Sequence, residues 1–177
     1  MKMYVMRYFI IFILVTECFV SCESYRIGVD SRTAKNVSEN FSREYTGLDT
    51  LIRTDGYYYH EDSTGLNSPF MMSNDREYYT LYVQYKNHIQ IQEGFRNKSD
   101  KSGRGKGNYT LSGDTIKVRW AMPFQIGCYD IFSQQYVIVN DTTLRQIFHL
   151  CETCNGEKRD PVRNEIYKFY KYPVEIK

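Results

Sequence analysis

Apolar and aromatic residues alternate with polar ones through most of the chain after residue 51. Successive side chains of a β-strand point to opposite faces, so this period of two is typical of strands with one buried face. The alternating runs are GYYYHE, YYTLYVQYK, HIQIQEGF, NYTLSG, TIKVRWA, QYVIVN, TLRQIFHL and IYKFYKY. No run of similar length follows the helical period of about 3.6 residues. The pattern therefore predicts an all-β protein.

The connections between these runs are short. Ser112-Gly113-Asp114 is a typical hairpin turn, because glycine readily adopts the positive φ that such turns need. Lys86-Asn87 and Asn140-Asp141 are further turn candidates. Strands joined by short turns form an antiparallel up-and-down meander, here of about eight or nine strands, and closure into a barrel removes its exposed edges. We therefore predict a closed meander barrel.

The N-terminus, MKMYVMRYFIIFILVTECFVSC, has the layout of an export signal: basic residues, a short apolar run, and small or apolar residues before Cys22. It resembles a bacterial lipoprotein signal, which implies that the thiol of Cys22 receives a diacylglycerol. A membrane-spanning helix is an alternative, but it needs about 20 apolar residues and Glu17 follows a shorter run. A secreted protein that is cleaved elsewhere is the other alternative.

This interpretation divides the chain into a signal peptide at 1–21, a lipidated cysteine with a polar tether at 22–47, and one domain at 48–177. Removal of the signal lowers the formal net charge from +2 to +1, since Lys2, Arg7 and Glu17 leave with it. A charge so close to zero gives no reason to expect nucleic-acid binding. We expect a protein that is lipid-anchored to a membrane of the bacterial cell envelope, with its folded domain outside the cytoplasm.

The order GYYY, YYTLYVQYK, GNYTLSGDTIKVRW, QYVIVNDTTLRQI and IYKFYKY resembles the lipocalin-like (calycin-type) domains of small bacterial surface lipoproteins. The likeness covers residues 48–172 and is one of rhythm. The family's opening glycine and tryptophan correspond to Gly56-Tyr57-Tyr58, with Tyr58 in the tryptophan's place. The resemblance implies a lipocalin-like barrel and binding of a small ligand, and it assigns no functional residues.

Three cysteines remain for disulfides after Cys22: Cys128, Cys151 and Cys154. Disulfides persist outside the cytoplasm, so we expect one either within the Cys151–Cys154 pair or from Cys128 to one member of it. The larger loop, of about 25 residues, is worth roughly 3 kcal/mol by chain entropy and favours the Cys128 bridge. A redox motif and a zinc site that adds His149 are alternatives, but neither has its usual sequence context.

Catalysis has no recognisable motif in this sequence. The three histidines, His60, His88 and His149, lie on or beside different predicted strands, and no nucleophile elbow, phosphate-binding loop or zinc-protease motif occurs. We therefore expect no enzymatic activity, no cofactor and no metal; a hydrolase of unknown substrate is the third hypothesis. The basic segment 96–106 is interpreted as a solvated hairpin loop, with binding of envelope phosphates as the alternative.

Aromatic residues in the alternating runs are candidates to line the barrel interior. These cavity candidates are Tyr79, Tyr85, Tyr109, Trp120, Tyr136 and Phe169. The first functional hypothesis is a non-catalytic lipoprotein that binds a small apolar or glycan ligand in such a cavity. The alternative is a protein-interaction module that docks on an envelope partner, which a filled barrel would favour.

Overall fold

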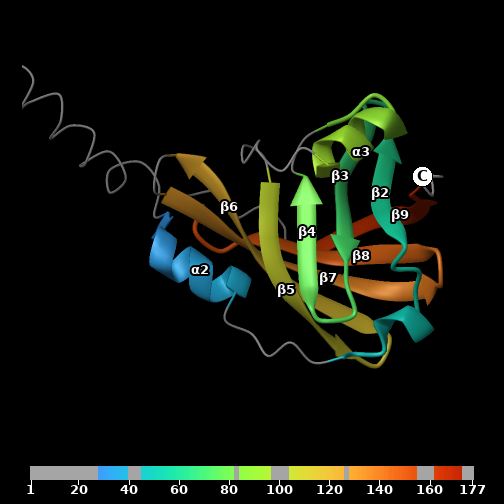
Figure 1. Ribbon diagram of the computed structural model, residues 1–177, viewed down its shortest axis with the longest axis horizontal. Coiled ribbons are helices and arrows are strands. Elements are labelled where there is room, and N and C mark those ends of the chain that lie inside the picture. Colours follow the sequence, from blue (N-terminus) through green and yellow to red (C-terminus); the bar gives the residue numbers. More distant parts are fainter. Residues whose placement is uncertain are drawn as a thin grey trace, which may run out of the picture.

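Eight antiparallel strands close into a barrel in the computed structural model (Figure 1), which describes residues 28–39, 45–81, 84–96, 104–125, 128–154 and 162–172. The strands are β2 (Gly56–Asp62), β3 (Gly65–Met72), β4 (Glu77–Leu81), β5 (Arg104–Ser112), β6 (Thr115–Gln125), β7 (Cys128–Asn140), β8 (Thr143–Cys151) and β9 (Val162–Lys171). Each strand pairs with the next, and β9 pairs with β2. The predicted all-β, up-and-down, lipocalin-like barrel is confirmed. The proposed signal peptide and Cys22 lie outside the described residues.

The barrel interior is a packed aromatic core to which all eight strands contribute. Its buried side chains are Tyr58, Phe70, Met72, Tyr78, Tyr109, Ile116, Val118, Trp120, Phe132, Tyr136, Leu144 and Tyr167. Burying a large apolar side chain stabilises the fold by roughly 1.5–3 kcal/mol. The alternation of the sequence therefore has its physical origin in this core.

One end of the barrel is closed by the short helix η1 (Leu48–Thr50) and the residues after it. Leu48 is fully buried and Ile52 is 1% exposed, and both join the interior core. The backbone N–H of Thr46 donates to the carbonyl of Asn74 at 3.0 Å, and that of Arg53 donates to the carbonyl of Asp141 at 2.8 Å. These bonds fix η1 against the β3–β4 and β7–β8 turns, so this end is sealed by the chain itself.

Residues 29–39 do not form the predicted tether. Val29–Asp30 is strand β1, which pairs with the start of β7, and Ser31–Glu39 is helix α2. Ala34 and Val37, three positions apart, pack against the outside of the barrel in a small apolar cluster with Ala121. Two small apolar residues in a nine-residue helix give too weak a pattern to stand out from a polar linker, which explains the wrong expectation.

The run HIQIQEGF was predicted as a strand but forms helix α3 (His88–Arg96). Ile91 is fully buried whereas Ile89 is 67% exposed, so the apparent alternation is accidental. The Asn87 side chain accepts the Gln90 backbone N–H at 3.0 Å, and the Gln90 side chain accepts the Lys86 backbone N–H at 3.0 Å. This reciprocal pair resembles a capping box, which starts a helix where the two isoleucines alone suggest a strand.

The two helices lie on the outside of the barrel at different places (Figure 1). Helix α2 packs on β5, β6 and β7, and α3 packs beside β4. Among the described residues, neither helix has the length and apolar character needed to cross a membrane.

Candidate functional site

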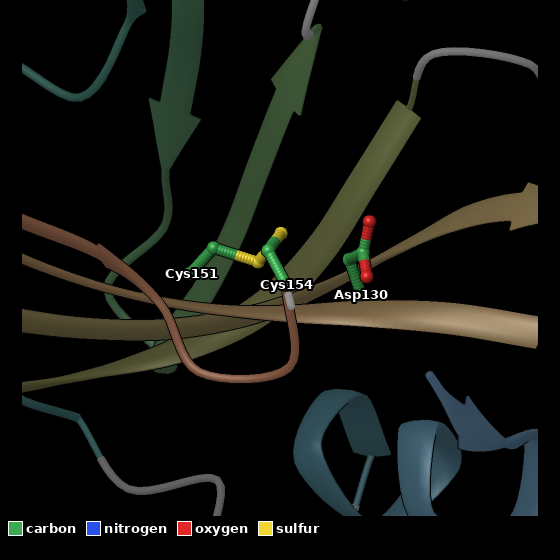
Figure 2. Close-up of side chains that lie close together, drawn as sticks. All are labelled: Asp130, Cys151 and Cys154. Carbon is green, nitrogen blue, oxygen red and sulfur yellow. A yellow bond between two sulfur atoms is a disulfide. The ribbon is translucent and has the colours of Figure 1, made fainter. Parts of the chain in front are cut away.

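The sharpest cluster of reactive side chains lies at the barrel end opposite η1, where β8 finishes. Cys151 and Cys154 form a disulfide with a Cα–Cα distance of 5.4 Å. Asp130, on the neighbouring strand β7, is only 2% exposed and lies beside the pair (Figure 2). The two sulfur atoms and a carboxylate oxygen of Asp130 all lie within 4.8 Å of one another. The cluster therefore brings two sulfur atoms, bonded here as a disulfide, close to one carboxylate.

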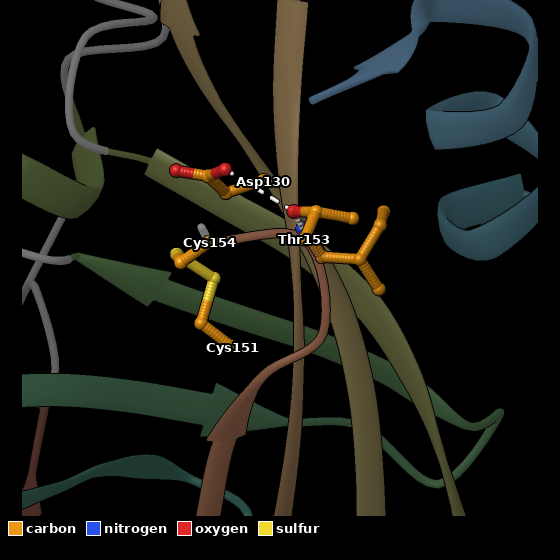
Figure 3. Close-up of a disulfide and its surroundings, with 5 residues drawn as sticks. Asp130, Cys151, Thr153 and Cys154 are labelled. Atoms are coloured by element: carbon orange, nitrogen blue, oxygen red, sulfur yellow. Dashed lines mark hydrogen bonds between the residues drawn. A yellow bond between two sulfur atoms is a disulfide. The ribbon is translucent and has the colours of Figure 1, made fainter. Parts of the chain in front are cut away.

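The two residues between the cysteines are fixed to β7 by hydrogen bonds. The Glu152 backbone N–H donates to the carbonyl of Ile131 at 2.7 Å, and the Ile131 N–H donates to the Thr153 hydroxyl at 3.0 Å. The same hydroxyl donates to a carboxylate oxygen of Asp130 at 3.1 Å (Figure 3). Beyond the end of β8, the Thr153 hydroxyl thus takes the place of a backbone carbonyl as the acceptor for the Ile131 N–H. It also orients the Asp130 carboxylate.

Glu152 holds the loop from the outside of the barrel. Arg119 on β6 binds both carboxylate oxygens of Glu152, with nitrogen–oxygen distances of 3.1 and 2.7 Å, and the Ser133 hydroxyl donates to the same carboxylate. Partial burial raises the pKa of Glu152, but the hydrogen bonds from Arg119 and Ser133 outweigh it and hold that pKa below its ordinary value. Glu152 is therefore ionised at neutral pH.

A chain of polar side chains runs through the barrel interior toward this end. The amide oxygen of Gln134 accepts hydrogen bonds from the hydroxyls of Tyr78 and Tyr136, at 3.0 and 2.9 Å. Its amide nitrogen lies 3.1 Å from Nδ1 of His149, and the Gln146 amide donates to the Tyr136 hydroxyl at 3.2 Å. Burial raises the pKa of both tyrosines, which keeps them as neutral donors. These groups satisfy one another, as buried polar groups must.

The histidines do not converge on one site. His149 contacts Gln134 in the interior, whereas His60 Nδ1 lies 3.0 Å from the carbonyl of Ile166. His88, on α3, lies outside the barrel: its Nδ1 is 2.8 Å from the Tyr57 hydroxyl, and its ring stacks on Tyr170 at 3.7 Å. Burial lowers the pKa of His88. The three rings belong to separate local networks.

The predicted cavity residues divide into two groups. Trp120 and Tyr136 are fully buried, Tyr109 is 1% exposed, and all three belong to the interior core. Phe169 packs against that core beneath the Arg53 guanidinium, which lies 5.1 Å from the ring centroid.

Tyr79 and Tyr85 are not interior residues. Tyr79 is 37% exposed and its hydroxyl donates to Glu77, while Tyr85 packs in an outer cluster with Leu66 and Ile91 of α3. The interior residues of β4 are Tyr78 and Thr80. Because α3 covers part of the outer face, both faces of this strand bury apolar groups. The prediction therefore placed Tyr79 in the interior, one position after the residue that lies there, Tyr78.

The prediction that Cys128 bridges to Cys151 or Cys154 is wrong, because those two cysteines bond to each other. Cys128 is buried at the start of β7, where it pairs with Asp30 of β1. In the β7–β8 register Cys151 faces Phe132, four residues farther along β7. Four strand residues span about 13 Å, which exceeds the roughly 7 Å limit between the Cα atoms of a disulfide. Geometry therefore overrides the entropic advantage of the larger loop.

The basic segment 96–106 is only partly a loop. Arg96 ends α3, and Arg104 and Lys106 belong to β5; residues 97–103 lie outside the described residues. The Arg104 guanidinium donates to the carbonyl of Gly94, near the end of α3. Lys106 lies 3.9 Å from Glu77 and over the ring of Tyr79. Arg104 and Lys106 thus already have partners within the fold.

A scan of protein-family models, a search of curated proteins and a search of solved structures each found no match to this chain. The likeness to a lipocalin-like fold rests on the strand order and the closure of the barrel.

Proposed function

We propose that this protein is a lipid-anchored lipoprotein of a bacterial cell envelope whose barrel is a non-catalytic module that binds a partner protein through its outer surface. The observation that supports this choice is the packed interior. Trp120 is fully buried and stacks on Phe132 with 4.4 Å between ring centroids, in a core built from all eight strands. A ligand in the middle of the barrel would have to displace these rings.

The proposed anchor is the thiol of Cys22. Five residues separate Cys22 from Gly28, where the described chain begins, and the six steps from one Cα to the next span at most about 20 Å. Strand β1 and helix α2 then attach this end of the chain to β5, β6 and β7. The lipid would therefore hold the barrel close to the membrane, where an envelope partner can be reached.

The anchor is tested by metabolic labelling with a fatty-acid analogue in a bacterium that processes lipoproteins. The parent protein should be labelled and membrane-bound, and Cys22→Ser should lose the label. Cys18→Ser is the matched control, because the proposed cleavage removes Cys18, and it should be labelled like the parent. A Cys22→Ser protein that keeps both label and membrane binding would refute the anchor.

Binding of a small apolar or glycan ligand stays a prediction, and one experiment separates it from partner binding. Trp120 is the single tryptophan and lies in the core, so an interior ligand must change its fluorescence. Native mass spectrometry of the detergent-extracted protein should give the mass of the lipidated chain alone, and titration with a fluorescent fatty acid or with oligosaccharides should leave Trp120 emission unchanged. A co-purifying small molecule that shifts this emission would overturn the proposal in favour of ligand binding.

The partner is sought by photo-cross-linking in the intact envelope. A photoreactive residue at exposed Leu150 on β8, or at exposed Lys117 on β6, samples different strands of the barrel surface. A discrete cross-linked protein at one position and not at the other would identify the contact face. Absence of any protein adduct at both of these positions and at the other exposed strand positions would contradict partner binding.

A further inference from the structure

We propose that the dithiol form of this protein binds a zinc ion through Cys151, Cys154 and Asp130. The ligand atoms of these three residues lie within 4.8 Å of one another. Thiolate sulfur and carboxylate oxygen are both ligands that Zn²⁺ accepts, at about 2.3 and 2.0–2.2 Å. A tetrahedral ion with such bonds separates its two sulfur ligands by about 3.8 Å, so the two sulfur atoms, which are bonded to each other in the disulfide, must move apart after reduction. This site is independent of the proposed envelope function.

The dithiol must form by reduction. An external dithiol supplies two electrons and two protons, the Cys151–Cys154 bond breaks, two thiols form, and the reductant becomes a disulfide. Zinc binding then releases the two thiol protons, because only thiolates are metal ligands. The oxidised pair has no thiolate, so the disulfide form does not bind the ion.

The arrangement of the ligands survives loss of the sulfur–sulfur bond. Glu152 and Thr153, which separate the cysteines, are held by hydrogen bonds to Ile131. The ion pair of Glu152 with Arg119, at 2.7 Å, holds the loop from the other side. A reduced Cys151-x-x-Cys154 segment therefore keeps its place beside β7 and presents both sulfurs on one side. Preorganisation of this kind lowers the ordering cost of binding.

Asp130 is the unusual member of the cluster because an acidic residue is almost fully buried. Its side chain is 2% exposed and accepts a hydrogen bond from the Thr153 hydroxyl at 3.1 Å. A buried carboxylate is stabilised by a nearby cation, and a hydrogen bond to a ligand carboxylate fixes its orientation toward a metal. Three protein ligands leave the fourth position of a tetrahedral ion for water.

Cobalt titration of the full chain tests the proposal, because tetrahedral Co²⁺ with thiolate ligands gives intense charge-transfer and visible bands. The protein is reduced with excess dithiol, freed of it without oxygen, and titrated with Co²⁺ and then Zn²⁺. One equivalent of Co²⁺ should develop the bands and Zn²⁺ should displace it. The unreduced protein should show neither.

Four variants separate the site from adventitious binding by other thiols. The double variant Cys151→Ser, Cys154→Ser should lose the cobalt bands, and Asp130→Asn should weaken binding more than Thr153→Val. The Thr153 variant is expected to lose about 10- to 100-fold in affinity, the usual effect of an outer partner. Asp114→Asn, in an exposed turn, is the matched control and should bind like the parent.

A second readout guards against misfolded variants. Zinc should slow alkylation of the two thiols in the reduced parent protein, which needs no substitution at all. Reduced parent protein that binds no Co²⁺, a double variant that binds it like the parent, or Asp130→Asn with unchanged affinity and a native circular-dichroism spectrum would each overturn the proposal.

Discussion

Replacement of Gly105 by alanine should destabilise the barrel strongly, because strand β5 passes directly over the Trp120 indole. A Cβ at Gly105 would lie 2.1 Å from Cε3 and 2.4 Å from Cζ3 of Trp120. Ordinary carbon–carbon contacts are about 3.5–4.0 Å, so the indole would have to move by more than about 1 Å. Trp120 is fully buried and stacks on Phe132 at 4.4 Å, so it has nowhere to move. We expect a loss near the top of the usual range for overpacking, about 3 kcal/mol.

Gly107 provides a comparison on the same strand and the same face. A Cβ there would lie 2.1 Å from the backbone carbonyl oxygen of Arg119 and 2.5 Å from the Cα of Trp120. These obstacles are backbone atoms, so shortening the side chain at position 120 cannot relieve them. Gly105→Ala should therefore cost only about 1 kcal/mol when combined with Trp120→Leu, a coupling of about 2 kcal/mol. Gly107→Ala should cost about 3 kcal/mol in both backgrounds.

The assay is urea unfolding followed by far-ultraviolet circular dichroism, because Trp120→Leu removes the single tryptophan. Trp120→Leu itself should cost several kcal/mol, so all variants are compared in a stabilising osmolyte. Gly113→Asn is the control: φ is +61° at Gly113 and no atom lies within 4 Å of its Cβ position, so asparagine should be tolerated. A neutral Gly105→Ala, or an equal cost in both backgrounds, would show that the indole is not the obstacle.

Three further predictions concern the disulfide, His88 and Tyr172. Replacing both Cys151 and Cys154 by serine should lower the free energy of unfolding by no more than about 2 kcal/mol in urea, because the disulfide closes a ring of only four residues. Burial lowers the pKa of His88, so on acidification the unfolded chain binds a proton at this histidine before the folded protein does. The free energy of unfolding should therefore fall as the pH drops below about 6.5. Unfolding curves at about pH 7.5 and 5.5 should show a smaller decline for His88→Gln. Burial raises the pKa of Tyr172 to about 12, so on alkalinisation the unfolded chain loses the Tyr172 proton before the folded protein does. The contribution of Tyr172 to the free energy of unfolding should therefore decline above about pH 10. In an alkaline titration, phenolate absorbance should rise in separate steps for exposed and buried tyrosines.

The closed meander was predictable because its signal is repeated along the chain. Seven of the eight barrel strands contain one of the alternating runs, whereas β3 has none and was not predicted. The β5–β6 turn has the glycine with positive φ that the sequence indicates. The faces were harder to assign. Tyr57 is fully buried and Tyr58 is 2% exposed, although neighbours in a strand point to opposite sides. Tyr58 belongs to the interior and Tyr57 to the cluster under α3, so alternation loses its meaning where a helix covers the outer face.

The candidate site was less accessible to sequence reasoning. The Cys151–Cys154 motif is visible, but Asp130 lies more than twenty positions away and reaches it only through the β7–β8 register. Gln134 is followed by a second glutamine in a strand, and nothing in that pair distinguishes the buried residue from the half-buried one. Long-range register decides both cases, and the local pattern that predicts a strand contains no information about its partner.

The position of the disulfide indicates whether it mainly stabilises the fold or mainly stores two thiols for binding. A structural disulfide stabilises most when it closes a long loop, and this one closes a short one. Its loop is also fixed by the bonds of Glu152 and Thr153 to Ile131, so the cross-link adds little to local order. Beside it lies the buried Asp130 carboxylate, which accepts a hydrogen bond from Thr153, a residue inside the same loop. The cysteine pair thus contributes little stability and keeps its place without its own sulfur–sulfur bond, and the Asp130 carboxylate lies buried beside it. Metal binding by the reduced thiols therefore explains the pair better than a structural role of the disulfide does.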